Sequence, residues 1–134
     1  MDKSIVIYIK EESDIIAVRK KGREIAEKLQ FDLTNQARIL TVVSELSRNI
    51  YRYAGTGHIE FELVEQARKK GIRIISTDEG CGIPDIEKAM QKGYSTSGSL
   101  GVGLPGVRSI MDEFNLESTP GLGTRVEAVK WQLR

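Results

Sequence analysis

The strongest folding signal in this sequence is an amphipathic helix that begins near Thr34 and stops at Gly55. Thr34 is a favourable N-cap residue, and glycine is common just beyond the last turn of a helix. Apolar residues recur between them at three- and four-residue spacing, which places them on one helical face; they are Ile39, Val42, Val43, Leu46, Ile50 and Tyr53. A helix with one apolar face has to pack against a second layer.

Short segments of alternating or β-rich character supply that second layer. We predict strands at residues 4–9, 59–64, 72–77, 115–119 and 125–132. Lys69-Lys70-Gly71 is interpreted as the turn between the second and third strands, and Pro120-Gly121-Leu122-Gly123 suits a hairpin between the last two. Further helices are predicted at residues 13–29, capped by Ser13 or Asp14, at 85–91, and from about Gly103 to Phe114.

These elements predict an α/β (α+β) two-layer sandwich, in which a mostly antiparallel mixed sheet carries helices on one face. The 134 residues show no internal repeat and no long linker, so we expect a single domain over residues 1–134.

Composition excludes several classes of partner. The 20 basic and 19 acidic side chains leave a net charge of +1, so no strong attraction to nucleic acid or to a membrane surface is expected. No apolar stretch approaches the roughly 20 residues that a spanning helix needs. Residues 1–10 alternate and do not resemble a signal peptide, and the single cysteine, Cys81, fits a reducing cytoplasm.

Three polar residues of the long helix are candidates for a ligand site. At about 100° per residue, Glu45, Asn49 and Arg52 fall within a sector of about 60° beside the apolar face. A carboxylate, an amide and a cation would then line the edge of the core. A solvated stripe, in which Glu45 pairs with Arg48 or Arg52, explains the same residues.

The turn after the third strand is a second candidate. Asp78 follows an apolar run and precedes Gly80 and Gly82, so its carboxylate could accept a hydrogen bond from a ligand amine while the glycines leave room for a flat ring. An ordinary turn at the end of a strand fits equally well.

Two further glycine segments follow. Residues 98–104 precede a helix and could seat a phosphate on backbone amides. Gly101 to Gly106 match GxGxxG, but no strand leads into them, and a Walker lysine is absent. Gly121-Leu122-Gly123-Thr124 places a hydroxyl beside a tight turn.

In this order and spacing, four motifs resemble those of the GHKL family of ATP-binding proteins, which includes gyrase B, Hsp90, sensor histidine kinases and MutL. They are ExxxN at residues 45–49, DxGxG at 78–82, GxGL at 101–104 and GxGT at 121–124. Longer strings at 44–51, 94–98 and 103–107 are similar to the switch kinases of bacterial stressosomes. The resemblance implies the GHKL fold and a serine/threonine kinase that uses Mg-ATP.

The resemblance also implies partners and residue roles. STAS-domain proteins, scaffold and antagonist, would be substrates, and the released kinase would activate a PP2C-type phosphatase in the general stress response. Glu45 would be the general base, Asn49 would hold Mg²⁺, Asp78 would bind the adenine amino group, and Arg52 would contact phosphate. Residues 95–103 would form a lid, and further nucleotide contacts are implied for Gly80, Gly82, Ser97, Gly98, Gly101, Val102, Gly103, Leu104 and Thr124.

Two other functions fit the sequence. An anti-sigma factor kinase of the same architecture would bind a sigma factor and phosphorylate its STAS antagonist. A non-catalytic docking module would have no need of Glu45. A sensor histidine kinase is disfavoured because the only histidine, His58, lies in a glycine-flanked turn, so the phosphoryl acceptor has to come from another protein.

Overall fold

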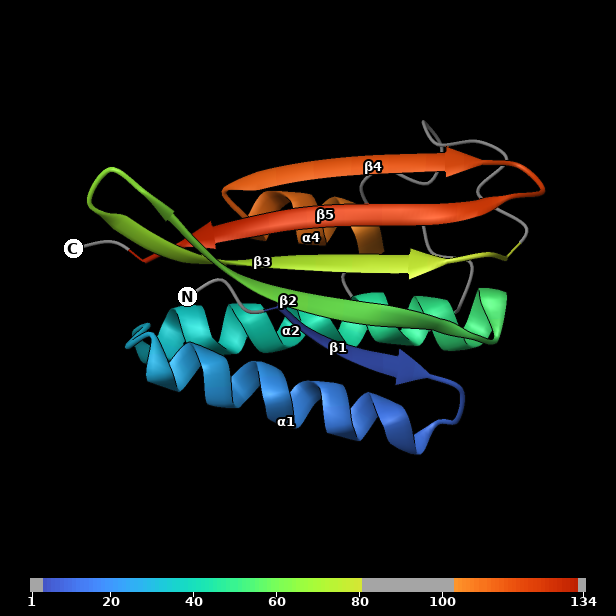
Figure 1. Cartoon of the computed structure of the whole chain (residues 1–134), viewed down its shortest axis with the longest axis horizontal. Coiled ribbons are helices and arrows are strands. Elements are labelled where there is room, and N and C mark those ends of the chain that lie inside the picture. The colour runs from blue at the N-terminus through green and yellow to red at the C-terminus, as the bar shows by residue number, and fades with distance from the viewer. Residues whose placement is uncertain (1–3, 81–102, 133–134) are drawn as a thin grey trace.

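A computed structural model describes residues 4–80 and 103–132 of the chain. Its strands form one sheet of order β1-β2-β3-β5-β4, with helices on one face (Figure 1). The elements are β1 (Ser4–Ile9), α1 (Ser13–Lys28), α2 (Leu33–Asn49), η1 (Ile50–Ala54), β2 (Gly57–Gln66), β3 (Lys69–Asp78), α4 (Gly103–Ile110), β4 (Glu113–Thr119) and β5 (Gly123–Trp131).

All four strand pairings within the described part are antiparallel, which confirms the predicted two-layer sandwich. The helix expected at residues 85–91 and the loop after it lie outside the described residues.

The core lies between the helices and one face of the sheet. Alternate strand residues point to this face, so the period-two pattern of the sequence becomes an apolar layer. Phe61 and Ile74 are buried there, and Val43 covers them from α2. Burying one such side chain contributes roughly 1.5–3 kcal/mol. Gly22 lets α1 approach closely, because a Cβ there would lie 3.3 Å from Val43 Cγ2.

The opposite face of the sheet carries ion pairs, and the described helices all lie on the other face. Arg73 bridges the strands, with Nη1 2.8 Å from Glu62 and Nε 2.9 Å from Glu127. Arg125 lies 3.0 Å from Glu127 on the same strand. Ile75 is buried under this layer, although none of the helices within residues 4–80 and 103–132 covers this face. None of the helices within residues 4–80 and 103–132 is long and apolar enough to cross a membrane.

Three helix ends differ from the sequence predictions. Asp32, not Thr34, caps α2, because its carboxylate accepts the Asn35 backbone N–H at 2.8 Å. The Asp14 side chain accepts N–H bonds from the preceding turn and is not the N-cap of α1. Helix α4 ends at Ile110, so the prediction that it reaches Phe114 was wrong: Phe114 lies in β4.

The turn between β2 and β3 is also displaced from its predicted place. Ala67 and Arg68 form it, and Lys69 and Lys70 already belong to β3. Gly71 lies inside β3. A glycine is needed there because a Cβ would come within 2.6 Å of the Lys130 carbonyl oxygen. Its glycine thus serves a close approach between strands and not a turn.

Candidate functional site

Asp78 is the last residue of β3, and the backbone around it is packed through glycines. A Cβ at Gly123 would lie 2.1 Å from the Asp78 carbonyl oxygen, and one at Gly57 would lie 3.0 Å from the Asp78 Cβ. Gly80 touches Ala54, where a Cβ would come within 2.7 Å of the Ala54 Cβ. Because neighbouring backbone segments approach so closely, the packing of the backbone fixes the position of Asp78.

The Asp78 carboxylate is half-buried and has a backbone partner. The Gly80 N–H donates to its Oδ1 at 2.9 Å. Burial raises the pKa of the Asp78 carboxyl above its ordinary value, and hydrogen bonds from the backbone of Gly80 and Thr124 offset part of this rise. A ligand that donates a hydrogen bond to the Asp78 carboxylate would replace a hydrogen bond to water that burial has removed.

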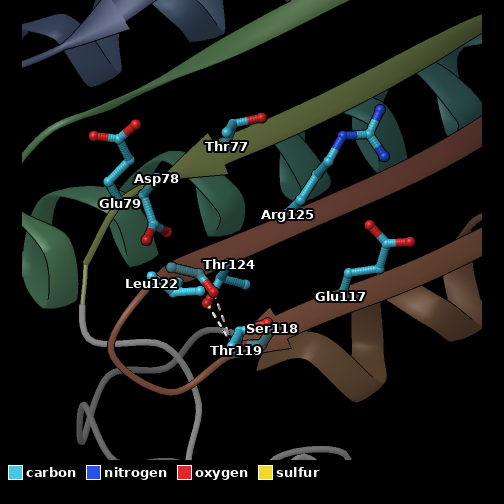
Figure 2. A pocket seen from close by; sticks show the side chains of 10 residues that line it. Thr77, Asp78, Glu79, Glu117, Ser118, Thr119, Leu122, Thr124 and Arg125 are labelled. Carbon is cyan, nitrogen blue, oxygen red and sulfur yellow. Dashed lines mark hydrogen bonds between the residues drawn. The ribbon is translucent and has the colours of Figure 1, made fainter.

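A shallow pocket of about 290 Å³, open to solvent and called the cavity below, lies beside this carboxylate, between the end of β3 and the β4–β5 hairpin (Figure 2). The volume of about 290 Å³ is just below the range of small-molecule sites, which span roughly 300–1,000 Å³. In Figure 2 the Asp78 carboxylate points toward Leu122 and Thr124, whereas Glu79 points the other way. The described lining residues are Thr77, Asp78, Glu79, Glu117, Ser118, Thr119, Leu122, Gly123, Thr124 and Arg125.

Ser118 is a residue of this cavity that the sequence analysis missed. Its hydroxyl lies 2.9 Å from Thr124 Oγ1 and donates to the Gly123 carbonyl oxygen at 3.2 Å. Ser118 and Thr124 face each other across the β4–β5 hairpin. The predicted hairpin could have indicated this pairing, since the turn fixes which residues are opposite.

The helix side of the site carries Glu45 and Asn49 near the end of α2. Glu45 is 6% exposed, which is unusual for a carboxylate and excludes a solvated stripe at this position. Arg48 Nη2 lies 3.4 Å from Glu45 Oε1, so the local pairing considered for the sequence is present. Asn49 is half-buried at the last position of α2.

A π-helix, η1, follows Asn49 directly and ends at Gly55, whose N–H donates to the Ile50 carbonyl oxygen at 2.8 Å. Its wider turn changes the direction of Arg52 from the α-helical sector that the sequence predicted, and Arg52 is exposed. Ala54, the last residue of η1, contacts Gly80. Segment η1 therefore joins the helix side of the site to the Asp78 turn.

The cavity itself includes Asp78 and Thr124 but, among the described residues, neither Glu45 nor Asn49. Gly103 begins α4 with a φ of +68°, and the Leu104 side chain is buried in the core, so only its backbone is available to a ligand. Gly82, Ser97, Gly98, Gly101 and Val102 lie outside the described residues.

The donors present suit Mg²⁺ and a nucleotide. Mg²⁺ usually keeps several waters and takes only one or two protein groups besides substrate phosphates. No group of three His, Cys, Asp or Glu side chains able to hold a metal occurs in residues 4–80 and 103–132, and a single amide such as that of Asn49 is compatible with this mode. Asp78 offers an acceptor in a glycine-framed cavity, which fits a base with an amino group.

Comparison with known proteins identifies the class. Residues 34–134 match the family of histidine kinase-, DNA gyrase B- and HSP90-like ATPases. The chain belongs to this ATP-binding family, which is the GHKL family indicated by the four motifs.

Individual relatives narrow the class further. The chain is 53% identical over 131 residues to the serine/threonine-protein kinase RsbT of Bacillus subtilis, with 98% of both chains covered. It is 38% identical over 112 residues to an anti-sigma F factor of Thermoanaerobacter, covering 79% of this chain and 77% of the relative. The chain is accordingly a serine/threonine protein kinase of the GHKL family that uses ATP.

Solved structures show the same fold. The RsbU and RsbW domains of Rv1364c from Mycobacterium tuberculosis match with a TM-score of 0.63 at 15% identity, over 97% of this chain and 32% of that chain. The catalytic domain of the histidine kinase ThkA matches with a TM-score of 0.53 at 18% identity, over 96% of both chains.

Proposed function

We propose that this kinase phosphorylates a serine or threonine of STAS-domain stressosome proteins in the cytoplasm and, once released from them, binds and activates a PP2C-type phosphatase. The similarity to RsbT over nearly the whole chain supports this assignment. One structural observation carries it: the Ala54–Gly80 contact joins the helix that bears Glu45 and Asn49 to the turn that bears Asp78. The segment that follows the buried Glu45 carboxylate is thereby packed against the turn that bears Asp78.

In this proposal each residue has a separate task. Asp78 accepts a hydrogen bond from the adenine amino group, and Thr124 borders the same cavity. Gly80, Gly82 and Leu104 supply backbone close to the nucleotide, while Ser97, Gly98, Gly101, Val102 and Gly103 belong to the segment that covers the phosphates. Arg52 contacts a phosphate. Because Arg52 is exposed on the π-helix η1, it would approach the phosphate from the solvent side. Asn49 holds Mg²⁺, which when bound neutralises phosphate charge.

Glu45 takes the proton in the transfer step. The acceptor hydroxyl oxygen forms a bond to the γ-phosphorus as the bond from that phosphorus to the β–γ bridging oxygen breaks, and ADP leaves. The hydroxyl proton moves to the Glu45 carboxylate. Arg48, 3.4 Å away, restrains this side chain, so part of the orientation that catalysis needs is in place before the substrate arrives.

The test separates binding from transfer. The purified protein is incubated with Mg-ATP and STAS proteins of the same organism, transfer is read by intact mass, and nucleotide affinity by calorimetry. Glu45→Ala should bind nucleotide normally but lose about 10²–10⁴-fold in transfer rate, the usual contribution of a general base. Asp78→Asn should lose about 10–100-fold in affinity, since an amide presents a donor to the ligand amine.

Glu27→Ala, which removes an exposed carboxylate of α1, is the matched control and should behave as wild type. Equal activity of all three variants and the wild type would refute the assignment.

A second candidate is an anti-sigma factor kinase, favoured by the 38% identity to an anti-sigma F factor. It would bind a sigma factor as well as phosphorylate a STAS antagonist. Gel filtration with the cognate sigma factor distinguishes the two, because a stable complex would favour this candidate.

A further inference from the structure

Arg48 is a cation beside the proposed general base, and most of its hydrogen-bonding capacity is unused. Its Nη2 lies 3.4 Å from Glu45 Oε1, which is longer than the roughly 2.7–2.9 Å of a strong charged hydrogen bond. A guanidinium has five N–H donors in a planar fork. Within residues 4–80 and 103–132, Glu45 is the one residue to which the Arg48 side chain is hydrogen-bonded or ion-paired. The other donors are therefore available to a group from another molecule.

The two members of this pair differ in their access to solvent. The Glu45 side chain is 7% exposed, whereas the Arg48 side chain is 39% exposed. A substrate hydroxyl that reaches the buried Glu45 carboxylate therefore brings its neighbouring residues next to the exposed guanidinium of Arg48.

The order of residues along α2 indicates the side from which the protein substrate arrives. Asn49 lies about 6 Å beyond Glu45 along the helix axis, and η1 then leads to the turn that bears Asp78. In the proposed function the nucleotide extends from Asn49 to Asp78, so ADP leaves toward Asp78. In-line transfer places the acceptor hydroxyl on the opposite side of the γ-phosphate. This is the Glu45 end, where the Arg48 guanidinium lies.

We propose that Arg48 is a specificity-determining residue, whose guanidinium binds a carboxylate of the protein substrate beside the acceptor serine or threonine. The inference rests on the proposed function, in which Glu45 takes the proton of that hydroxyl. A carboxylate matches the planar fork of arginine in bidentate geometry, and such pairs are among the strong hydrogen bonds of proteins. A lysine or arginine of the substrate at the same place would meet a like charge. The kinase therefore discriminates between STAS proteins by the charge next to the acceptor.

Steady-state kinetics of transfer to a STAS protein of the same organism, with saturating Mg-ATP, test this role. Arg48→Ala should raise the KM for the STAS protein about 10–100-fold, the loss expected for hydrogen bonds between charged groups. It should lower kcat only about two- to fivefold, because Glu45 loses its restraint. The affinity for ATP, measured by calorimetry, should stay within about twofold of wild type. Arg48→Lys keeps the charge without the fork and should have an intermediate KM.

An exchange of charges tests the same contact from the side of the substrate. Arg48→Glu should phosphorylate the unaltered STAS protein less well than Arg48→Ala does, because two carboxylates would then face each other. Lysine is substituted, one position at a time, for the acidic residues that flank the phosphorylated hydroxyl of the STAS protein. One of these substrates should be phosphorylated better by Arg48→Glu than by the wild-type kinase. The absence of any such substrate would overturn the inference.

Arg38→Ala is the matched control on the same helix. Arg38 is exposed and has a similar weak contact three residues away, with Nη1 3.3 Å from Asn35 Oδ1. It lies about 15 Å from Arg48 along the helix axis. Its loss should therefore leave the KM for the STAS protein unchanged. An equal rise of KM in Arg38→Ala and Arg48→Ala would mean that the STAS protein is attracted to the positive charge of α2 in general, and would refute a specific contact.

The remaining results also decide. A fall in kcat at unchanged KM would restrict Arg48 to orienting Glu45. A loss of ATP affinity as large as the rise in KM would make Arg48 a phosphate contact, and either result overturns the inference while the kinase proposal stands. If Arg48→Ala does not fold, Arg48→Gln, which keeps most of the side-chain length, gives the same comparison. Failure of the wild-type protein to phosphorylate any STAS protein overturns the proposed function and this inference together.

Discussion

The two hairpins of the sheet lie at opposite ends of the molecule and use different turn residues (Figure 1). The β4–β5 turn contains Gly121, and Gly123 follows it as the first residue of β5, with φ of +83° and +133°. The β2–β3 turn has Ala67 at a φ of +55°, a conformation that glycine adopts more easily than alanine. At the β4–β5 hairpin, beside the candidate site, the residues with positive φ are glycines. At the β2–β3 hairpin the residue with positive φ is an alanine, whose backbone is strained.

The difference shows what the glycines near the site are for. Relief of strain alone would favour glycine equally at both ends. At Gly123 a second requirement is present, because the Asp78 backbone occupies the place of a Cβ. Around Ala67 no ligand-binding residue has been assigned, so about 1–2 kcal/mol of left-handed strain is tolerable there. We infer that close backbone approach, more than turn geometry, sets the sequence at the site end.

The largest effect is expected for Gly123→Ala. A Cβ 2.1 Å from the Asp78 carbonyl oxygen forces β3 and β5 apart, and the positive φ adds strain of about 1–3 kcal/mol. We expect a loss of more than about 3 kcal/mol in the free energy of unfolding by urea, and loss of ATP binding. Gly121→Ala is the matched control in the preceding turn. Nothing lies within 4 Å of a Cβ there, so only backbone strain is added, and the free energy of unfolding should fall by about 1 kcal/mol. Equal destabilisation by both would mean that turn strain, and not close approach, dominates.

A smaller effect tests the contact that joins the two sides of the site. Gly80→Ala places a Cβ 2.7 Å from the Ala54 Cβ and should destabilise the fold by about 1–3 kcal/mol and weaken ATP binding. Ala54→Gly in the same chain removes one of the clashing atoms, although the Ala54 Cα at 2.9 Å remains. A double-mutant cycle on unfolding and on ATP affinity should therefore show partial rescue. Strict additivity would disprove the coupling.

The sequence allowed the fold to be predicted because its apolar periodicity is regular. All five strands and helices α1, α2 and α4 lie where the pattern placed them, apart from their ends. The end of α4 was decided by distant contacts. Phe114 continues the helical spacing, but the Asp112 N–H donates to Val129 and the Asp112 carboxylate accepts from Trp131, which draws the chain into the sheet after Ile110.

The site was predictable to the extent that it depends on motifs. Asp78 and Thr124 were predicted as site residues and line one cavity, and Glu45 was predicted and is buried; their roles stay predictions. Ser118 belongs to no motif and is revealed only by strand register. The π-helix at Ile50–Ala54 was missed because its residues fit an α-helix by spacing, and only the hydrogen bond from the Gly55 N–H to the Ile50 carbonyl oxygen, five residues back, distinguishes the two.

The site end should also differ in its response to pH. Since burial raises the pKa of Asp78 above 3.8 in the folded protein, the folded state binds more protons than the unfolded state just above that pH, and stability falls as the pH rises through this window. Asp78→Asn removes the effect, so its free energy of unfolding relative to wild type should increase from pH 4 to 7.

Glu24→Gln is the control of opposite sign. The Lys21 ammonium hydrogen-bonds to Glu24 and lowers its pKa, so this carboxylate contributes stability above its unfolded pKa and loses it in acid. The Glu24→Gln variant should therefore become less stable relative to wild type as the pH rises. Urea unfolding curves of Asp78→Asn that stay parallel to wild type across the window would contradict the predicted role of burial.

The smallest effect is expected at the far hairpin, where Ala67→Gly should stabilise the protein. Glycine relieves the strain of about 1–2 kcal/mol at a φ of +55°, and loses about 0.4–1 kcal/mol through greater freedom of the unfolded chain. The balance is a gain of roughly 0.5 kcal/mol, which thermal unfolding should register as a rise of about 1–3 °C. Arg68→Gly, at the turn position that does not share the positive φ, gains nothing and should destabilise. ATP affinity should be unchanged in both, because this turn lies at the end of the sheet away from Asp78 (Figure 1). If Ala67→Gly instead lowered the melting temperature, the far turn would need its alanine for packing, and the contrast between the two hairpins would no longer separate strain from close approach.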